Sequence, residues 1–239
     1  MSKHFVLVHG AWHGSWAWDG VIAELEAAGH TAEAVVLPGT GPEDPRGDVT
    51  FDDYVDAIVD NLQAQPVPVI LVGHSSAGFL LQAAAPRAAD KIEKVVFHNA
   101  FILPDGTSQF DLVPPEASAG LTAAAGATPD NAVPVIPDVV CNMLMPEEPK
   151  EMQDALISKL VPQPLTLFTT RIDAKPFAAL DVPRAVVFCR DDASLPPGAF
   201  LGMAQSLGEF DLVETPGGHE TLFTKPEVVA KALLQVAGD

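Results

Sequence analysis

The sequence predicts an α/β fold in which a mostly parallel β-sheet is flanked by helices and carries a mainly helical cap insertion. Strand-like apolar runs alternate with helical apolar patterns over residues 4–100. The alternation stops near Leu103 and resumes near Arg184. Alternating strands and helices favour βαβ units, whose parallel sheet is covered by helices on both faces.

Each expected element of the first half follows from its side-chain pattern. The strands are short apolar runs at 4–10, 31–39, 67–73 and 92–100. The helices carry apolar residues every three or four positions, at 18–30, 50–65 and 76–85. Gly29 and Pro86 stand where two of these helices should end, and Thr50 is a typical N-cap for the third.

The middle of the chain has a different composition. Residues 104–180 are rich in Pro, Gly and Ala, and only 146–160 has a helical pattern. The alternation then returns with strands at 184–192 and 210–217 and helices at 196–207 and 225–237. We therefore expect a core domain, residues 1–103 and 181–239, interrupted by a cap insertion, residues 104–180. An insertion after a strand is expected over the carboxyl edge of the sheet, where α/β proteins bind ligands.

The charge balance argues against two classes of partner. The formal net charge is −19, from 13 Lys and Arg against 32 Asp and Glu. Such a surface repels phosphate backbones and anionic lipid head groups, so we expect neither nucleic acid nor membrane as a partner. A small-molecule substrate is expected instead. A homodimer is compatible with the sequence, which does not define the oligomeric state.

Segments that would direct the chain to another compartment are not recognised in the sequence. No apolar run approaches the roughly 18 residues of a membrane span, and the first one is too short for a signal peptide. Cys141 and Cys189 form neither a disulfide framework nor a metal-ligand pattern. These features predict a cytoplasmic protein that uses no metal and no other cofactor.

A serine stands between an expected strand and an expected helix. The stretch Gly73-His74-Ser75-Ser76-Ala77 matches G-x-S-x-G except that Ala77 replaces the last glycine. In a tight strand-to-helix turn the central side chain projects above the sheet, and the helix N-terminus supplies free N–H groups beside it. Ser75 is therefore a candidate nucleophile. The alternative is that Ser75 merely caps the helix, which is a common role of serine.

A serine nucleophile needs a base and an acid that orients the base. His219 lies in the glycine-rich loop between the last expected strand and helix, where we expect an exposed and mobile side chain. Asp191 and Asp192 follow the preceding strand, and either residue is a candidate acid. The chain order Ser, Asp, His is that of the α/β-hydrolases.

The negative charge that forms during acyl transfer needs N–H donors. One candidate donor is the backbone N–H of Ser76, directly after the candidate nucleophile. The other is the backbone N–H of Ala11, in the loop after the first strand, where Gly10 lets the backbone approach a ligand. The alternative is that His9-Gly10 is an ordinary turn at the end of a strand.

These stretches together resemble the hydroxynitrile lyase and plant methyl-esterase branch of the α/β-hydrolase superfamily. The resemblance rests on "FVLVHGAWHGSWAWDGVIAELEAAGH", "VILVGHSSAGF", "KVVFHNAFILPDG", "FCRDDASLPP" and "GGHETLFTKPEVVAKAL", and the middle of the chain matches only loosely. It implies that Ser75 is the nucleophile and His219 the base. It also implies that Asp192 is the acid, because the family's acid stands a few residues before the Leu-Pro of "ASLPP".

Three departures separate this chain from parts of that branch. The lyases carry a lysine directly after the catalytic histidine, where this chain has Glu220, and a threonine where it has Gly10. A carboxylate at that position would repel cyanide, so cleavage of cyanohydrins is not expected. Ala77 stands where relatives usually have glycine, which predicts a slight outward shift of the following helix.

Large apolar and aromatic residues near the strand ends and in the middle of the chain are candidates for the substrate pocket. They are Trp12, His13, Phe79, Phe101, Leu103, Met143 and Phe168. An aromatic or terpenoid-sized acyl group would fit such a lining. For any single one of these residues, packing in the core is the competing explanation.

The leading hypothesis is a serine hydrolase, of the carboxylesterase type, that cleaves small uncharged carboxylic esters or lactones through an acyl-enzyme on Ser75. A second hypothesis keeps the fold but changes the reaction to that of a lyase, a C–C bond hydrolase or a cofactor-free enzyme that uses His219 as a base. A third is a ligand-binding protein without catalysis, since a fold alone does not define a function.

Overall fold

Six parallel strands form the centre of the molecule. The computed structural model describes residues 2–238. The strand order is β2-β1-β3-β4-β7-β8, and every neighbouring pair is parallel. The strands are β1 (His4–Val8), β2 (Thr31–Ala34), β3 (Val69–His74), β4 (Ile92–His98), β7 (Arg184–Cys189) and β8 (Asp211–Thr215). The predicted sheet is confirmed, although β2 is shorter than the apolar run that predicted it.

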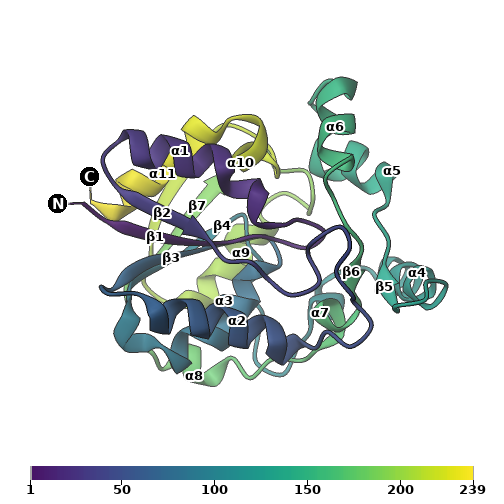
Figure 1. Ribbon diagram of the computed structural model, residues 1–239, viewed down its shortest axis with the longest axis horizontal. Coiled ribbons are helices and arrows are strands. Elements are labelled where there is room, and N and C mark those ends of the chain that lie inside the picture. The colour runs from purple at the N-terminus through teal and green to yellow at the C-terminus, as the bar shows by residue number, and fades with distance from the viewer. Residues whose placement is uncertain (1, 239) are drawn as a thin grey trace.

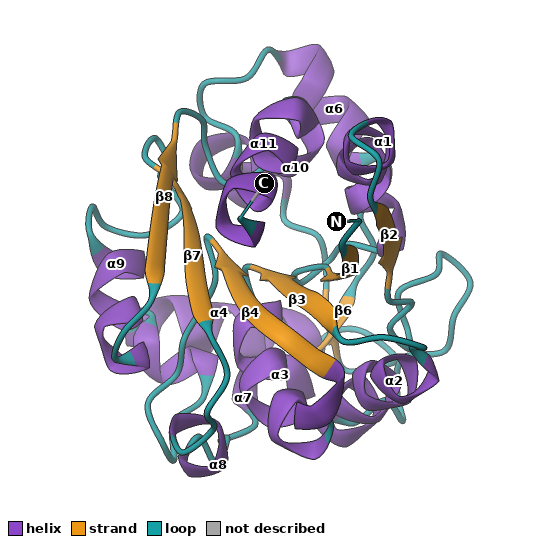
Figure 2. Cartoon of the chain, turned by 90° about the vertical axis from the view of Figure 1, so that its left-hand side faces the viewer, coloured by secondary structure: helices purple, strands orange, loops and turns teal. Residues whose placement is uncertain are grey.

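Helices cover both faces of the sheet, as Figures 1 and 2 show. The helices around the sheet are α1 (Asp19–Ala27), α2 (Phe51–Ala64), α3 (Ala77–Ala84), α9 (Ala199–Ala204), α10 (Thr221–Thr224) and α11 (Pro226–Ala237). Helices α1 and α11 pack on one face, and α2 and α3 on the other. In the described part of the chain, no helix is long and apolar enough to cross a membrane.

The alternation of side chains along each strand divides the core into two layers. Along β3, Leu71 packs with α2 and α3, whereas Ile70 and Val72 pack with α1 and α11. Because both faces are covered, all six residues of β3 are buried. The continuous apolar run that predicted this strand is therefore a consequence of helices on both sides.

The segment that joins β4 to β7, residues 99–183, is called the inserted segment below. It contains α4 (Pro115–Gly126), α5 (Pro137–Val139), α6 (Lys150–Ile157), α7 (Thr166–Thr169), α8 (Lys175–Ala178) and a small ribbon of β5 (Ala132–Val133) and β6 (Gln163–Pro164). Short 3₁₀ turns occupy Ser15–Trp18, Ala85–Arg87, Ala89–Lys91, Gln109–Leu112 and Gln205–Leu207, and Val140–Leu144 is a π-helical turn. In Figure 1, α4, α5 and α6 lie at the end of the molecule opposite to the two chain termini.

Close packing between α3 and the start of the inserted segment gives a first testable prediction. A Cβ atom added at Gly78 would lie 2.3 Å from the backbone oxygen of Phe101, which cannot move easily. We expect Gly78→Ala to lower the free energy of unfolding by about 1–3 kcal/mol, measured by urea denaturation. Gly202 in α9 has no atom within 4 Å of such a Cβ, so Gly202→Ala is the control and should be neutral or stabilising. Equal effects of the two substitutions would contradict the prediction.

Candidate active site

Ser75 occupies a sharp turn between β3 and α3. Its φ angle is 55°, in the left-handed region that non-glycine residues seldom adopt. The surrounding packing enforces this turn: a Cβ atom on Gly73 would lie 2.8 Å from Leu81, and Ala77 is fully buried. The turn therefore has the strained backbone expected for a nucleophile that projects above the sheet.

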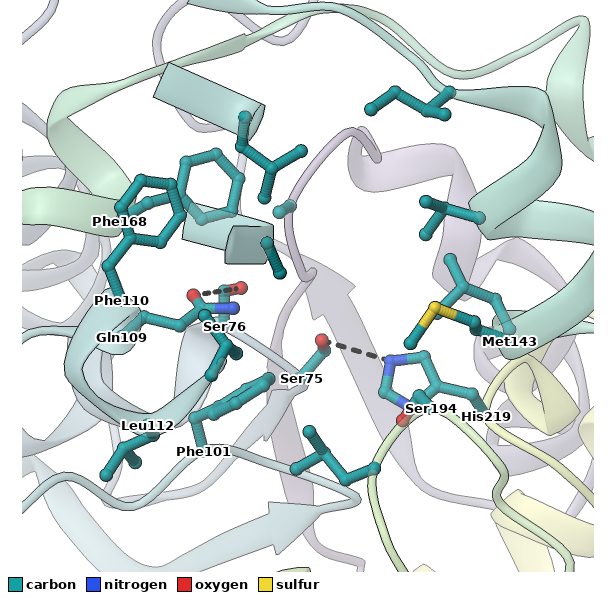
Figure 3. A pocket seen from close by; sticks show the side chains of 18 of the residues that line it. Ser75, Ser76, Phe101, Gln109, Phe110, Leu112, Met143, Phe168, Ser194 and His219 are labelled. Carbon is teal, nitrogen blue, oxygen red and sulfur yellow. Dashed lines mark hydrogen bonds between the residues drawn. The ribbon is translucent and has the colours of Figure 1, made fainter. Parts of the chain in front are cut away.

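Three side chains from three strand ends meet at this turn. His219 Nε2 lies 3.0 Å from Ser75 Oγ, and His219 Nδ1 lies 2.7 Å from Asp192 Oδ2. Figure 3 shows the first of these hydrogen bonds across the floor of the cavity. The strands are parallel, so the residues that follow β3, β7 and β8 lie at one edge of the sheet. This geometry can pass a proton from the serine to the histidine while the aspartate holds the histidine ring.

Asp192, and not Asp191, contacts His219. Asp192 Oδ1 accepts hydrogen bonds from the backbone N–H and the hydroxyl of Ser194, at 2.9 and 2.6 Å. Its Oδ2 also accepts from the Asn99 amide. Asp191 is exposed and accepts from the Gly217 backbone N–H at 2.8 Å. The two candidate acids are thus distinguished by geometry.

The pKa values of Asp192 and His219 suit their roles as acid and base. Burial alone would raise the pKa of Asp192, but His219 and the Ser194 hydrogen bonds outweigh it and lower that pKa to about 2. Burial alone would lower the pKa of His219, but the Asp192 carboxylate outweighs it and raises that pKa above 6.5. Asp192 therefore stays ionised and strengthens His219 as a base.

The expectation that the His219 side chain is exposed is wrong, whereas its expected mobility stays a prediction. Its side chain is only 3% exposed. The ring stacks on Phe200, with centroids 6.0 Å apart, and its backbone oxygen is 3.0 Å from His74 Nε2. Burial lowers the pKa of His74 well below 6.5, so this second histidine is neutral and braces the loop without competing as a charge. The loop that carries His219 is therefore in contact with both Phe200 and His74.

The loop after β1 approaches Ser75 closely enough to supply an N–H donor. A Cβ atom on Gly10 would lie 2.7 Å from Ser75 Cβ, so only glycine allows this approach. Ala11 and Ser76 both line the cavity. The backbone N–H groups of Ala11 and Ser76 have no hydrogen-bond acceptor among residues 2–238. Both are therefore available to a substrate oxygen.

Trp12 ties this loop to the inserted segment. Its φ angle is 65°, and its backbone N–H donates to Gln163 Oε1 at 3.0 Å. Its indole N–H donates to the Val133 carbonyl at 3.2 Å, and its own carbonyl accepts from the Val161 N–H at 2.9 Å. The strained conformation beside Ser75 is therefore held by three contacts with the β5–β6 region.

A cavity of about 810 Å³ opens above Ser75. Of the residues expected to form its wall, it is lined by Trp12, His13, Phe101, Met143 and Phe168. Phe79 and Leu103 are corrections, because neither lines the cavity. Phe79 is fully buried and stacks on Phe51 of α2, whereas Leu103 is buried and its N–H donates to the Gln82 side chain at 2.8 Å.

Several contacts at the site had no sequence-based expectation. Asn99, directly after β4, bonds to Asp192, and Ser194 bonds to Asp192 and lies 3.1 Å from His219 Nδ1. The sequence could have indicated both residues, because Asn99 directly follows a strand and Ser194 is two residues beyond the candidate acid. Gln109 and Phe110 also line the cavity. They lie in a stretch without periodicity, which offered no signal.

Glu220 forms a buried ion pair on the cavity wall. Its Oε2 lies 3.1 Å from His13 Nε2, and the two side chains are 1% and 3% exposed. Burial would raise the pKa of Glu220 and lower that of His13, but the opposite charge of the partner outweighs burial in both residues. The pKa of Glu220 is therefore lowered and the pKa of His13 is raised, so both residues favour their ionised forms. His13 Nδ1 is 2.8 Å from the Ala11 carbonyl, so the pair also braces the loop after β1.

Loss of one charge of this pair should destabilise the fold. We expect Glu220→Gln to lower the free energy of unfolding by about 3 kcal/mol near pH 5.5, measured by urea denaturation. The lowered pKa of Glu220 stabilises the fold above pH 4.5, and this is lost as the pH falls through the folded pKa. The raised pKa of His13 stabilises it below pH 6.5, and this is lost as the pH rises through the folded pKa. The effect should therefore be largest between those values.

The control for this substitution is Glu214→Gln, which neutralises an exposed carboxylate on β8. We expect it to change the stability by less than about 0.5 kcal/mol at every pH. A loss in Glu220→Gln no larger than that in the control, or one that grows steadily above pH 6.5, would contradict the stabilising role of the ion pair.

A parallel sheet that brings a strained serine, a histidine and an aspartate together at its carboxyl edge is typical of enzymes of the α/β-hydrolase class. Comparison of the sequence with known protein families supports this class. The chain matches the model of the alpha/beta hydrolase family over residues 5–232, and it belongs to that family.

Relatives of known name place the chain within the family. It is 29% identical over 255 residues to norfluorocurarine synthase 2 of Strychnos sp, covering 98% of this chain and 95% of the relative. It is 29% identical over 257 residues to methylesterase 2 of Arabidopsis thaliana, covering 98% and 96%. It is similar in structure to an extracellular alpha/beta-hydrolase from a Paenibacillus species, described as sharing homology with tobacco salicylic acid binding protein 2. That match has a TM-score of 0.92, 26% identity and 98% coverage of both chains. The protein is an enzyme of the methylesterase-like branch.

Proposed function

We propose that the protein is a serine esterase that cleaves small uncharged carboxylic esters, lactones included, through an acyl-enzyme on Ser75. The observation that carries the proposal is the pair of contacts made by His219, 3.0 Å to Ser75 Oγ and 2.7 Å to Asp192 Oδ2. The methylesterase name of one relative supports an ester as substrate.

The reaction would proceed in two halves. Ser75 Oγ attacks the ester carbonyl and gives its proton to His219 Nε2, while the Ala11 and Ser76 N–H groups bind the oxyanion. The alcohol leaves with the proton from His219, and the acyl group stays on Ser75. His219 then takes a proton from water, the hydroxide attacks the acyl carbonyl, and Ser75 Oγ regains the proton as the acid is released.

The cavity favours uncharged substrates. Its wall is mostly apolar, and the ionised groups on it include Glu220, whose charge is balanced by His13 at 3.1 Å. No lysine or arginine is among its described lining residues. A carboxylate or phosphate on the substrate would lose its hydration without gaining a counter-charge, which is costly.

Glu220, the residue directly after His219, argues against the activity of a cyanide lyase. Glu220 and His13 form a neutral pair as a unit, so this side of the cavity offers no net positive charge to a cyanide leaving group. Three alternatives remain to be distinguished by an assay of ester cleavage. They are hydrolysis of C–C bonds, base chemistry at His219 without a cofactor, and ligand binding without turnover.

Chemical trapping tests the proposal most directly. The purified protein should hydrolyse 4-nitrophenyl acetate and butyrate, and an alkyl fluorophosphonate should stop this activity with a single adduct. Peptide mass spectrometry should place that adduct on Ser75, because His219 activates its hydroxyl and the two N–H groups bind the phosphonyl oxygen. A folded protein that cleaves neither ester, or an adduct elsewhere with Ser75 unmodified, would overturn the proposal.

A further inference from the structure

One polar group of the cavity wall has donors without a partner. Gln109 is 9% exposed and lines the cavity beside Ser76. Its Oε1 accepts a hydrogen bond from Ser76 Oγ at 2.9 Å. Its Nε2 donates to no acceptor in the described part of the chain. Figure 3 shows this amide with its nitrogen towards the middle of the cavity. The wall therefore offers two N–H donors in largely apolar surroundings.

The amide is held in place from both ends. Its 3₁₀ turn, Gln109–Leu112, is capped by Ser108, whose backbone N–H and hydroxyl both donate to Asp111 Oδ2 at 2.8 Å. Arg171 bonds to the other oxygen of Asp111 at 2.9 Å. At the far end, the Ser76 hydroxyl orients the amide oxygen. A group that is fixed in this way can select a ligand with little loss of conformational entropy.

The position of Gln109 relates it to one half of the substrate. In the tetrahedral intermediate the leaving oxygen must face His219 Nε2, and the oxyanion must face the Ala11 and Ser76 N–H groups. The acyl chain therefore extends away from His219. In Figure 3, Gln109, Phe110 and Phe168 lie on the side of Ser75 opposite to His219. The rings of Phe110 and Phe168 stack with centroids 5.5 Å apart.

We propose that Gln109 makes the enzyme select esters whose acyl group carries an oxygen acceptor, such as an ether, hydroxyl or keto oxygen, within an otherwise apolar or aromatic chain. The acceptor would bind Gln109 Nε2, and the apolar part would pack on Phe110 and Phe168. An all-carbon acyl chain would leave the N–H donors without a partner in a buried site, which lowers its relative rate. This specificity rests on the proposed ester hydrolysis at Ser75.

Matched 4-nitrophenyl esters test the specificity. The phenoxyacetate is compared with the 3-phenylpropionate, and the benzyloxyacetate and 3-phenoxypropionate are each compared with the 4-phenylbutyrate. In each pair one CH₂ becomes an oxygen. The oxygen is one CH₂ away from the carbonyl in the phenoxyacetate and the benzyloxyacetate, which differ in the distance from the oxygen to the ring, and two CH₂ groups away in the 3-phenoxypropionate. The measured quantity is the ratio of kcat/KM for the oxygen ester to that for the carbon ester. Dividing the wild-type ratio by a variant's ratio cancels the intrinsic reactivity of the esters.

We expect Gln109→Leu to lower this ratio by roughly tenfold for at least one of the three oxygen esters, because it removes the donor and keeps the bulk. Ser76→Ala should lower it less, since it frees the amide to turn. Met143→Leu changes an apolar wall residue on the His219 side of Figure 3, and it should leave every ratio within twofold. Ratios within twofold of wild type for all three pairs in Gln109→Leu would overturn the proposal.

Failure of the esterase proposal itself would look different. If the folded wild type cleaves none of the five esters, the binding of the corresponding primary amides is measured by tryptophan fluorescence. Of the three tryptophans, Trp12 lies on the cavity wall. Tighter binding of an oxygen-containing amide than of its carbon counterpart, with the difference lost in Gln109→Leu, would support the subsite without ester hydrolysis. Equal binding within each pair would overturn the subsite as well.

Discussion

Ser75→Ala should lower kcat/KM for 4-nitrophenyl butyrate by at least about 10³-fold, with the fold unchanged. The substitution removes the oxygen that lies 3.0 Å from His219 Nε2, and alanine leaves no atom that can form an acyl bond. The residual rate would come from oxyanion binding and substrate positioning alone. Steady-state kinetics at pH 8 with freshly purified protein measure the loss, and circular dichroism checks the fold.

Ser206→Ala is the matched control for this substitution. Ser206 is exposed, and its hydroxyl donates to the Met203 carbonyl at 2.7 Å and to no other acceptor among residues 2–238. We expect it to keep full activity. If Ser75→Ala retained more than about a tenth of the wild-type rate, Ser75 would not be the nucleophile, and the strained turn would need another explanation.

Asp192→Asn should lower kcat/KM by roughly 10³–10⁴-fold, because the amide no longer stabilises the protonated histidine or holds its reactive tautomer. The same change should move the pH profile. His219 must be neutral to act as a base, so the wild-type kcat/KM falls as the pH drops through its raised pKa. Without the Asp192 carboxylate, burial dominates and lowers the pKa of His219. The acidic limb should therefore move to lower pH, which a profile between pH 5 and 9 measures.

The neighbouring aspartate provides the control. Asp191→Asn changes the same functional group one residue away, where the carboxylate is exposed and bonds to the Gly217 backbone. We expect a loss of less than about tenfold and no shift of the acidic limb. If the two substitutions had equal effects on rate and pH profile, the contacts around Asp192 would not define the acid.

The parallel sheet and the turn at Ser75 are predictable from the sequence for physical reasons. Burial on both faces forces a continuous apolar run on β3, and the close approach of strand and helix requires Gly73 and a small residue at 77. These constraints act locally, so they leave local patterns. The choice of Asp192 over Asp191 depends on which side chain turns towards His219, and the residues alone left it open.

The cavity wall is less predictable, because position near a strand end does not define the layer that a side chain joins. Phe101 reaches the cavity, whereas Phe79 and Leu103 pack into the core. The position of Gln109 on the cavity wall depends on the path of the inserted segment. The short elements of that segment lack a repeating apolar pattern from which the path could be predicted. The Glu220–His13 pair joins residues far apart in the chain, and no local pattern signals such a contact.

The contacts of Trp12 with Gln163, Val133 and Val161 bear on how enzymes of this kind can be recombined. They mean that the inserted segment is not an interchangeable part that only shapes the choice of substrate. A chimaera that received another enzyme's insertion would lose the support of the Ala11 N–H unless the donor also brought partners for Trp12. Exchange of substrate preferences by grafting should therefore succeed only when the loop after β1 and the β5–β6 ribbon are transferred together.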